Sequence, residues 1–372
     1  MVNFKHPSGL RFLQNKKTPF INLKKIIKLA KSLKLVSEDR IIIDELINSL
    51  NNNKFPFILT PQEYFHLERM DEKKWIKYLI YRYKLNIYPE KKIISKFPVY
   101  LLVEPTSVCN LRCVMCFQID KSFTKKPFMG FMNFNLFKKI IDEASSNGTS
   151  AITLASRGEP LLHPKISQMI KYVSKKKNFI DVKLNTNATK LNEKLCHEIL
   201  NSNINIVVIS IDSHIEKQYE EIRKGGKYTQ VLKNIKLLAD IRNKYYKNSG
   251  LEIRVSGVKF KKEQNEKEFK KFWSKIVDNV AYVQCQERWN TYENIPNKKN
   301  NHPCVYLWER LYIWFDGVCN PCDADYKSLL SPGNLSNKTI KQIWHSKELN
   351  KLRKLHLEKK RHKYNPCDRC GL

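Results

Sequence analysis

Apolar runs with two different periods alternate along the middle of the chain, between residues 98 and 286. Six of the runs have the length and continuity of strands, at 98–104, 150–155, 180–185, 206–211, 252–258 and 280–285. Between them the period changes to that of a helix, as in Phe137, Ile140, Ile141 and Ala144. This alternation predicts an α/β fold with a parallel sheet, and six βα units would leave a barrel partly open. The reactive loops of such a sheet lie at the carboxyl ends of its strands.

Three cysteines directly follow the first predicted strand. Cys109, Cys113 and Cys116 stand in the run Val-Glu-Pro-Thr-Ser-Val-Cys-Asn-Leu-Arg-Cys-Val-Met-Cys-Phe. Thiolates are soft anionic donors, and three of them on one short loop can hold an iron–sulfur cube while one iron stays without a protein ligand. A zinc knuckle is the competing interpretation, but it normally needs a fourth ligand nearby. No cysteine or histidine stands in 117–131.

The spacing Cys-x3-Cys-x2-Cys after an apolar strand resembles the radical S-adenosylmethionine (SAM) superfamily. The resemblance implies a partial (β/α)6 barrel in which Cys109, Cys113 and Cys116 bind a [4Fe–4S] cluster. The amino and carboxylate groups of SAM chelate the open iron in that superfamily. Reduction of the cluster then cleaves SAM to a 5′-deoxyadenosyl radical, which removes a hydrogen atom from the substrate.

A turn after the second predicted strand matches a SAM-binding position of the superfamily. Gly158, Glu159 and Pro160 resemble the end of the Gly-Gly-Glu-Pro segment whose backbone holds the SAM amino group. Arg157 replaces the first glycine, which puts the backbone contact at that position in question because glycine permits conformations that other residues resist. An ordinary βα turn is the alternative interpretation.

Further polar residues stand at the ends of later strands. Asn187 follows the strand at 180–185, and Ser210 and Asp212 close the strand at 206–211, where the superfamily commonly places contacts to SAM. Arg223 resembles a superfamily position that faces the SAM carboxylate, and a guanidinium fork suits that anion. A solvated arginine at a helix end is the alternative.

The C-terminal part of the chain contains a second group of cysteines. An Asp-Gly turn precedes a Pro-Cys pair, Gly-Asn and Ile-Trp segments follow, and a Cys-x2-Cys pair ends the chain. This order closely resembles the SPASM domain and its shortened twitch form, which bind auxiliary iron–sulfur clusters. Matched residue by residue, the resemblance implies one auxiliary [4Fe–4S] cluster with four cysteine ligands, Cys304, Cys322, Cys367 and Cys370.

Two alternatives remain open for this second group. Cys319 stands three residues before Cys322 and competes with it as a ligand, although the register of the Asp316-Gly317 turn favours Cys322. Paired Cys-x2-Cys motifs also bind zinc.

The chain carries 68 basic and 36 acidic residues, for a formal charge of +32. The electric field of so large a positive charge attracts phosphates, nucleic acid and anionic membranes. Most of the basic residues are lysines spread over the whole length, which indicates compositional drift as much as a binding stripe. A basic amphipathic pattern at Leu23, Ile26, Ile27, Ala30 and Leu33 predicts a helix packed on the rest of the protein with its lysines in water.

A chain of 372 residues exceeds what one core usually holds. We expect a mostly helical accessory region at 1–97, the partial barrel at 98–286, a polar linker at 287–303 and the SPASM or twitch domain at 304–372. No apolar stretch approaches the roughly 20 residues that cross a bilayer, and the N-terminus lacks the apolar region of a signal peptide. Cysteines in metal-like clusters favour a reducing compartment, so we expect a cytoplasmic protein.

The function expected from the resemblance is that of a radical SAM oxidoreductase. The radical would oxidise a C–H bond of a small molecule or carbohydrate, the auxiliary cluster would accept an electron, and a flavodoxin- or ferredoxin-like protein would supply the reductant. Peptide or protein maturation is the second expectation and modification of RNA the third, since the charge permits nucleic acid as a partner without favouring it. A non-catalytic metal-binding scaffold is the remaining alternative.

Overall fold

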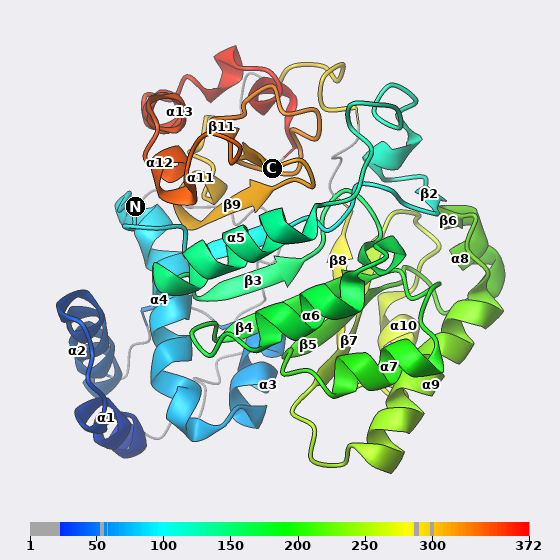
Figure 1. Ribbon diagram of the computed structural model, residues 1–372, viewed down its shortest axis with the longest axis horizontal. Coiled ribbons are helices and arrows are strands. Elements are labelled where there is room, and N and C mark those ends of the chain that lie inside the picture. The colour runs from blue at the N-terminus through cyan, green and yellow to red at the C-terminus, as the bar shows by residue number, and fades with distance from the viewer. Residues whose placement is uncertain (1–22, 53–55, 58, 286–289, 298–300, 372) are drawn as a thin grey trace.

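The computed structural model of the protein describes residues 23–52, 56–57, 59–285, 290–297 and 301–371. Over these residues the chain forms one nine-stranded sheet, in the order β11-β10-β9-β1-β3-β4-β5-β7-β8, with helices packed on it (Figure 1). The strands of the partial barrel pair in parallel with their neighbours. They are β1 (Tyr100–Val103), β3 (Ala151–Leu154), β4 (Asp181–Thr186), β5 (Ile206–Ser210), β7 (Glu252–Lys259) and β8 (Asn279–Gln284). All six predicted strands are thereby confirmed.

The helices of the βα units carry the apolar stripes that the sequence predicts. Phe137, Ile140, Ile141 and Ala144 are all buried on one helix, α5, whose first N–H groups are capped by the Asn133 side chain. In Figure 1, α5, α6 and α7 lie across the same face of the sheet. The helices are α5 (Phe134–Ser146), α6 (Ile166–Ser174), α7 (Glu193–Leu200), α8 (Glu216–Ile222), α9 (Tyr228–Tyr245) and α10 (Glu266–Trp273).

The described part of residues 1–97 is helical, as expected. Its helices are α1 (Leu23–Ser32), α2 (Ser37–Asn51), α3 (Pro61–Arg69) and α4 (Trp75–Lys91). They share an apolar core with Val99, Ala151 and Ile180, at the amino ends of the first barrel strands. The helical region therefore covers the end of the barrel opposite to the one where the reactive loops lie.

The first of these helices confirms the packing that its pattern predicts. Ile26 and Ala30 of α1 are buried, whereas Lys24, Lys28 and Lys31 are exposed. Among the described residues, no helix has the length and apolar character needed to span a membrane.

The C-terminal segment continues the barrel sheet, which the sequence did not predict. The strand β9 (Arg310–Ile313) pairs in parallel with β1, with Arg310 opposite Tyr100. Two short strands, β10 (Val318–Asn320) and β11 (Gly333–Asn334), extend the sheet in antiparallel fashion. The helices of this segment are α11 (Tyr306–Glu309), α12 (Ile340–Trp344) and α13 (Lys347–Leu357).

Short elements complete the fold around the loops. A two-stranded ladder joins β2 (Arg112–Cys113) to β6 (Arg223–Lys224) beside the cysteine loop. The single-turn helices are η1 (Glu72–Lys74), η2 (Phe117–Ile119), η3 (Pro160–Leu162), η4 (Arg361–Lys363) and η5 (Cys367–Arg369). The linker expected at 287–303 lies partly outside the described residues, and the bounds of the four expected regions stay predictions.

Candidate iron–sulfur centres

The first three cysteines lie on the loop that leaves the carboxyl end of β1. Burial raises the pKa of Cys109 to about 11 and that of Cys116 to about 12, and it also raises the pKa of Cys113. The loop is anchored through Val114, whose backbone N–H donates to the carbonyl of Ile222 in α8 at 3.0 Å. Protonated thiols in a buried loop become thiolates when a cation binds them, because the metal reverses the local charge balance.

The Gly-Glu-Pro turn packs directly against this loop. The backbone N–H of Glu159 donates to the carbonyl of Val108 at 2.9 Å, one residue before the first cysteine. The buried Glu159 carboxylate accepts from the hydroxyl of Thr186 and from the backbone N–H of Asn187, both at 2.6 Å. Burial raises the pKa of Glu159, although these donors oppose the shift. Glu159 therefore fixes the end of β4 against the turn.

The carboxyl end of β4 contacts the cysteine loop as well. The Asn187 side chain donates from Nδ2 to Oδ1 of Asn110, at 3.0 Å. Ser210 ends β5 and is partly exposed. The structure thus brings the turn and Asn187 together around the loop.

Arg223 lies beside the cysteine loop rather than in solvent. Its Nε is 2.8 Å from Oδ2 of the fully buried Asp212, and its Nη1 is 4.0 Å from Sγ of Cys113. Burial alone would lower the pKa of Arg223, but the neighbouring Asp212 carboxylate outweighs burial and holds the pKa above its usual value, so the guanidinium stays charged. The alternative of a solvated helix-end arginine is wrong.

Gly158 stands where a side chain has no room. A Cβ at this position would overlap the carbonyl oxygen of Thr106, which is backbone and cannot move aside easily. We expect Gly158→Ala to lower the free energy of unfolding by about 1–3 kcal/mol and to weaken SAM binding in equilibrium dialysis. Gly250→Ala is the matched control, because nothing lies within 4 Å of its Cβ. Equal stability and SAM affinity in the two variants would contradict the close approach.

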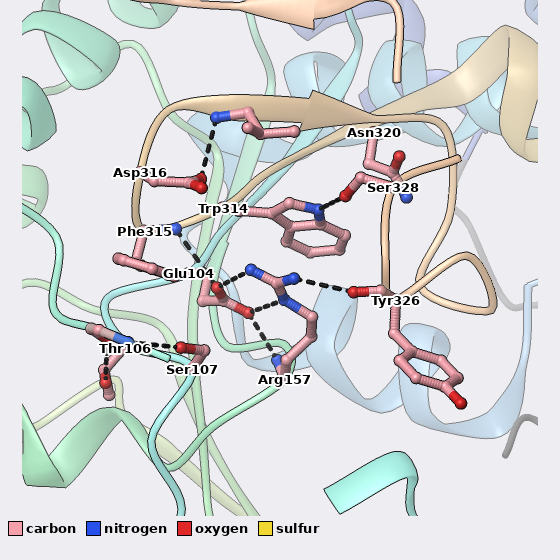
Figure 2. Close-up of polar contacts among 12 residues, drawn as sticks. Glu104, Thr106, Ser107, Arg157, Trp314, Phe315, Asp316, Asn320, Tyr326 and Ser328 are labelled. Atoms are coloured by element: carbon pink, nitrogen blue, oxygen red, sulfur yellow. Dashed lines mark hydrogen bonds and ion pairs between the residues drawn. The ribbon is translucent and has the colours of Figure 1, made fainter. Parts of the chain in front are cut away.

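Arg157, at the position of the missing glycine, connects the turn to the C-terminal segment (Figure 2). Its Nε and Nη2 lie 2.8 and 2.7 Å from the two carboxylate oxygens of Glu104, which directly follows β1. Its Nη1 donates to the carbonyl of Tyr326 at 2.9 Å. The guanidinium also lies over the ring of Trp314, 4.2 Å from the centroid. The sequence carried no signal for these contacts.

The same segment reaches the residues that follow the third cysteine. The rings of Phe117 and Tyr326 stack with centroids 5.0 Å apart. The hydroxyl of Tyr326 donates to Asp120 at 2.9 Å, and the ammonium of Lys327 lies 2.7 Å from the same carboxylate. The loop that follows Cys322 therefore packs on the loop that follows Cys116.

Four C-terminal cysteines line one pocket, namely Cys304, Cys322, Cys367 and Cys370. Burial raises the pKa of Cys304 to about 11, and it raises the pKa of Cys322 and Cys367 as well. Across the described part of the chain, no group of His, Cys, Asp or Glu side chains converges on a point where a single metal ion could bind. A cube is held at its corners, so its thiolates line a common cavity instead of meeting at one point.

Two basic side chains are among the other residues that line this pocket, whereas Cys319 does not line it. Cys319 is fully buried in the main apolar core, with its sulfur 3.8 Å from the carbonyl of Gly317. The two side chains are His356 and Arg361, both of them buried. Burial alone would lower the pKa of Arg361, but thiolates at the four cysteines outweigh burial and raise the pKa above its usual value. The guanidinium is therefore within electrostatic reach of all four sulfur atoms.

Comparisons with known proteins agree with this arrangement. Residues 103–251 match the radical SAM superfamily, and residues 304–371 match SPASM, described as an iron–sulfur cluster-binding domain. A GTP 3′,8-cyclase of Clostridium botulinum (strain Hall) is 34% identical over 136 residues, which is 37% of this chain and 42% of the cyclase. The chain thus spans less than half the length of that relative. AlbA, the subtilosin biosynthesis protein of Bacillus subtilis, is 26% identical over 290 residues, 68% of this chain and 61% of AlbA.

Solved structures share the fold over most of the chain. BtrN in complex with AdoMet and 2-DOIA superimposes with a TM-score of 0.51 at 20% identity, covering 75% of this chain and 95% of BtrN. Streptococcus suis SuiB bound to the precursor peptide SuiA gives a TM-score of 0.54 at 15% identity, covering 90% of this chain and 81% of SuiB.

The two family matches indicate which cofactors the protein uses. They are a [4Fe–4S] cluster that binds SAM and auxiliary iron–sulfur clusters. The loop with three cysteines lies in the first match and the pocket with four in the second. The chain therefore belongs to the radical SAM superfamily, as an enzyme with a partial barrel and a C-terminal SPASM domain.

Proposed function

We propose that the protein is an oxidoreductase that oxidises a C–H bond of a small molecule or carbohydrate. The observation that carries the proposal is the single pocket lined by four cysteines, which fits one auxiliary cluster with every iron ligated by the protein. A fully ligated cube cannot bind SAM, so its role is either electron transfer or holding the domain together, and we propose electron transfer. One auxiliary cluster resembles the alcohol-oxidising members of the superfamily.

The cysteines divide between the two clusters according to their places in the fold. Cys109, Cys113 and Cys116 would hold the cluster that binds SAM, because they share one loop at the carboxyl end of β1. The four cysteines of the pocket would hold the auxiliary cluster. When bound, the clusters and SAM supply a radical that removes hydrogen from the substrate and an acceptor for the remaining electron.

Side chains of the barrel would bind and orient SAM around the first loop. Arg223 keeps its charge beside Cys113 and would meet the SAM carboxylate. The backbone of the turn at 158–160 would hold the amino group, with Glu159 fixing the turn against β4. Asn187, Ser210 and Asp212 stand at the strand ends where contacts to the rest of SAM would form.

A protein donor would supply electrons to the first cluster. We propose a flavodoxin- or ferredoxin-like reductant, because both are one-electron donors of low potential. No disulfide forms among the described cysteines, which fits a reducing compartment such as the cytoplasm.

A second candidate function is peptide maturation. AlbA, a bacteriocin biosynthesis protein, resembles this chain over 68% of its residues, more than the cyclase does. A peptide substrate would use the same two clusters. RNA modification has only the overall charge in its favour.

The deciding experiment measures 5′-deoxyadenosine released by reconstituted enzyme in fractionated cell extract under anaerobic conditions. We expect release with SAM and dithionite to depend on the low-molecular-mass ultrafiltrate and to survive protease and RNase treatment of the extract. Protease-sensitive release would favour the peptide substrate instead. RNase-sensitive release, with binding that weakens steeply as salt is added, would favour RNA. Protein that contains zinc and does not cleave SAM would favour the non-catalytic scaffold.

The choice between Cys319 and Cys322 as a ligand is testable by iron content. We expect Cys322→Ala to lose about half of the iron of the reconstituted protein, since one of two cubes is lost, and to keep SAM cleavage while product formation falls. Cys319→Ala is expected to keep all of its iron, because Cys319 lies outside the pocket. The reverse pattern of iron loss would exchange the two assignments.

A further inference from the structure

Arg361 is the one cation among the described residues that line the pocket of the four cysteines. It lies in η4, between α13 and the final cysteine pair, and only 3% of its surface is exposed. His356 also lines the pocket, but its Nδ1 accepts the backbone N–H of Cys304 at 3.1 Å. That nitrogen therefore carries no proton, and the imidazole is neutral.

Asp325 is a buried carboxylate three residues after Cys322, and its oxygens are directed to other partners. Its oxygens accept the N–H groups of Leu329 and Leu330 at 2.9 and 2.8 Å. They also accept the hydroxyl of Tyr292 at 2.8 Å. Asp325 does not line the pocket, whereas Arg361 does. Among the described residues, the lining of the pocket therefore includes the positive charge of Arg361 and no carboxylate.

A buried positive charge acts differently on the two redox states of a cluster. A cube held by four thiolates is already an anion, and reduction adds a further negative charge. Attraction to a guanidinium is therefore greater in the reduced state, and exclusion of water keeps the attraction from being screened. An uncharged or solvent-exposed side chain would not have this effect.

We infer that Arg361 raises the reduction potential of the auxiliary cluster and so makes that cluster an acceptor for the substrate's electron. The inference rests on the proposed function, in which Cys304, Cys322, Cys367 and Cys370 hold the cluster. Arg361 is assigned a tuning role here and does not contact SAM or substrate. The inference explains why a long cationic side chain is buried among sulfur ligands.

The experiment uses protein in which Cys109, Cys113 and Cys116 are replaced by alanine, so that only the auxiliary cluster is reconstituted. Its midpoint potential is measured by redox titration followed by electron paramagnetic resonance. At the midpoint potential of this parent, we expect Arg361→Gln to show at least a tenfold lower ratio of reduced to oxidised cluster. For a one-electron couple that is a shift of 59 mV to more negative potential. Arg361→Lys is expected to keep most of the parent potential.

Lys363→Gln is the matched control, because Lys363 belongs to the same turn but is exposed to solvent. Its potential should equal that of the parent, since water and salt screen the charge. An unchanged potential in Arg361→Gln, or an equal shift in Lys363→Gln, would overturn the inference.

Loss of iron in Arg361→Gln would make Arg361→Lys the deciding variant. A lysine variant that binds iron at the parent potential would support the need for a charge. A lysine variant that also loses its iron would show that Arg361 only holds the fold, which overturns the inference. A parent that binds no iron at all would instead refute the four-cysteine assignment, and the inference with it.

Discussion

Cys113→Ala is expected to reduce SAM cleavage to the background of SAM incubated with dithionite alone. Two thiolates would remain on the loop, and two corners do not fix a cube with an open iron. Arg223 would also lose the sulfur atom that its guanidinium faces. The measurement is 5′-deoxyadenosine per enzyme by liquid chromatography, with iron content determined on the same sample. The variant should keep the iron of the auxiliary cluster, which is about half of the total.

Cys196→Ala is the matched control for this loss. Cys196 is also a fully buried cysteine, but it lies in the apolar core on α7, away from both cysteine groups. Removing its sulfur is expected to cost about 1 kcal/mol of stability through the small cavity left behind, with iron content and SAM cleavage unchanged. SAM cleavage retained in Cys113→Ala would refute the three-cysteine assignment.

Arg157→Ala is expected to cost about 3–5 kcal/mol of stability, because it leaves the Glu104 carboxylate buried without its counter-charge. The pair is 2% and 0% exposed, and Arg157 also bonds the carbonyl of Tyr326. Urea unfolding of the reconstituted protein, followed by tryptophan fluorescence, measures the change. We also expect more SAM to be cleaved per product formed, because the two cysteine regions are no longer connected through this side chain.

Two further variants separate the buried pair from an ordinary ion pair. Arg157→Met combined with Glu104→Gln should be less destabilised than Arg157→Ala, since no charge is left unpaired. Lys270→Ala removes an exposed partner of Glu266, with both side chains about half in solvent, and should cost less than about 0.5 kcal/mol. Equal costs for Arg157→Ala and Lys270→Ala would contradict a buried, charged contact.

The sequence predicted the elements that depend on local periodicity. All six barrel strands and the helix at 134–146 follow from which residues are apolar and how far apart they stand. The two cysteine sets were identified from their resemblance to the radical SAM and SPASM motifs, and their role as ligands stays a prediction. Cys322 lines the pocket and Cys319 does not, which supports the choice that the Asp316-Gly317 register favoured.

The sequence could not predict partners that are distant along the chain. A short apolar run such as 310–313 indicates that the segment is buried, but it does not indicate that the segment pairs with β1. Arg157 illustrates the same limit for a side chain, since its position in a turn does not reveal that Glu104, Trp314 and Tyr326 surround it. Long-range pairing depends on the packing of the whole molecule, and a local pattern contains no record of it.

The pairing of β9 with β1 means that the C-terminal segment is not a detachable module. Cutting the chain before β9 would strip β1 of one neighbour and leave its backbone N–H and C=O groups unpaired along that side. An open edge of this kind invites pairing with other chains, so a shortened protein would tend to aggregate. Both cluster-binding regions therefore have to be produced together as one continuous sheet.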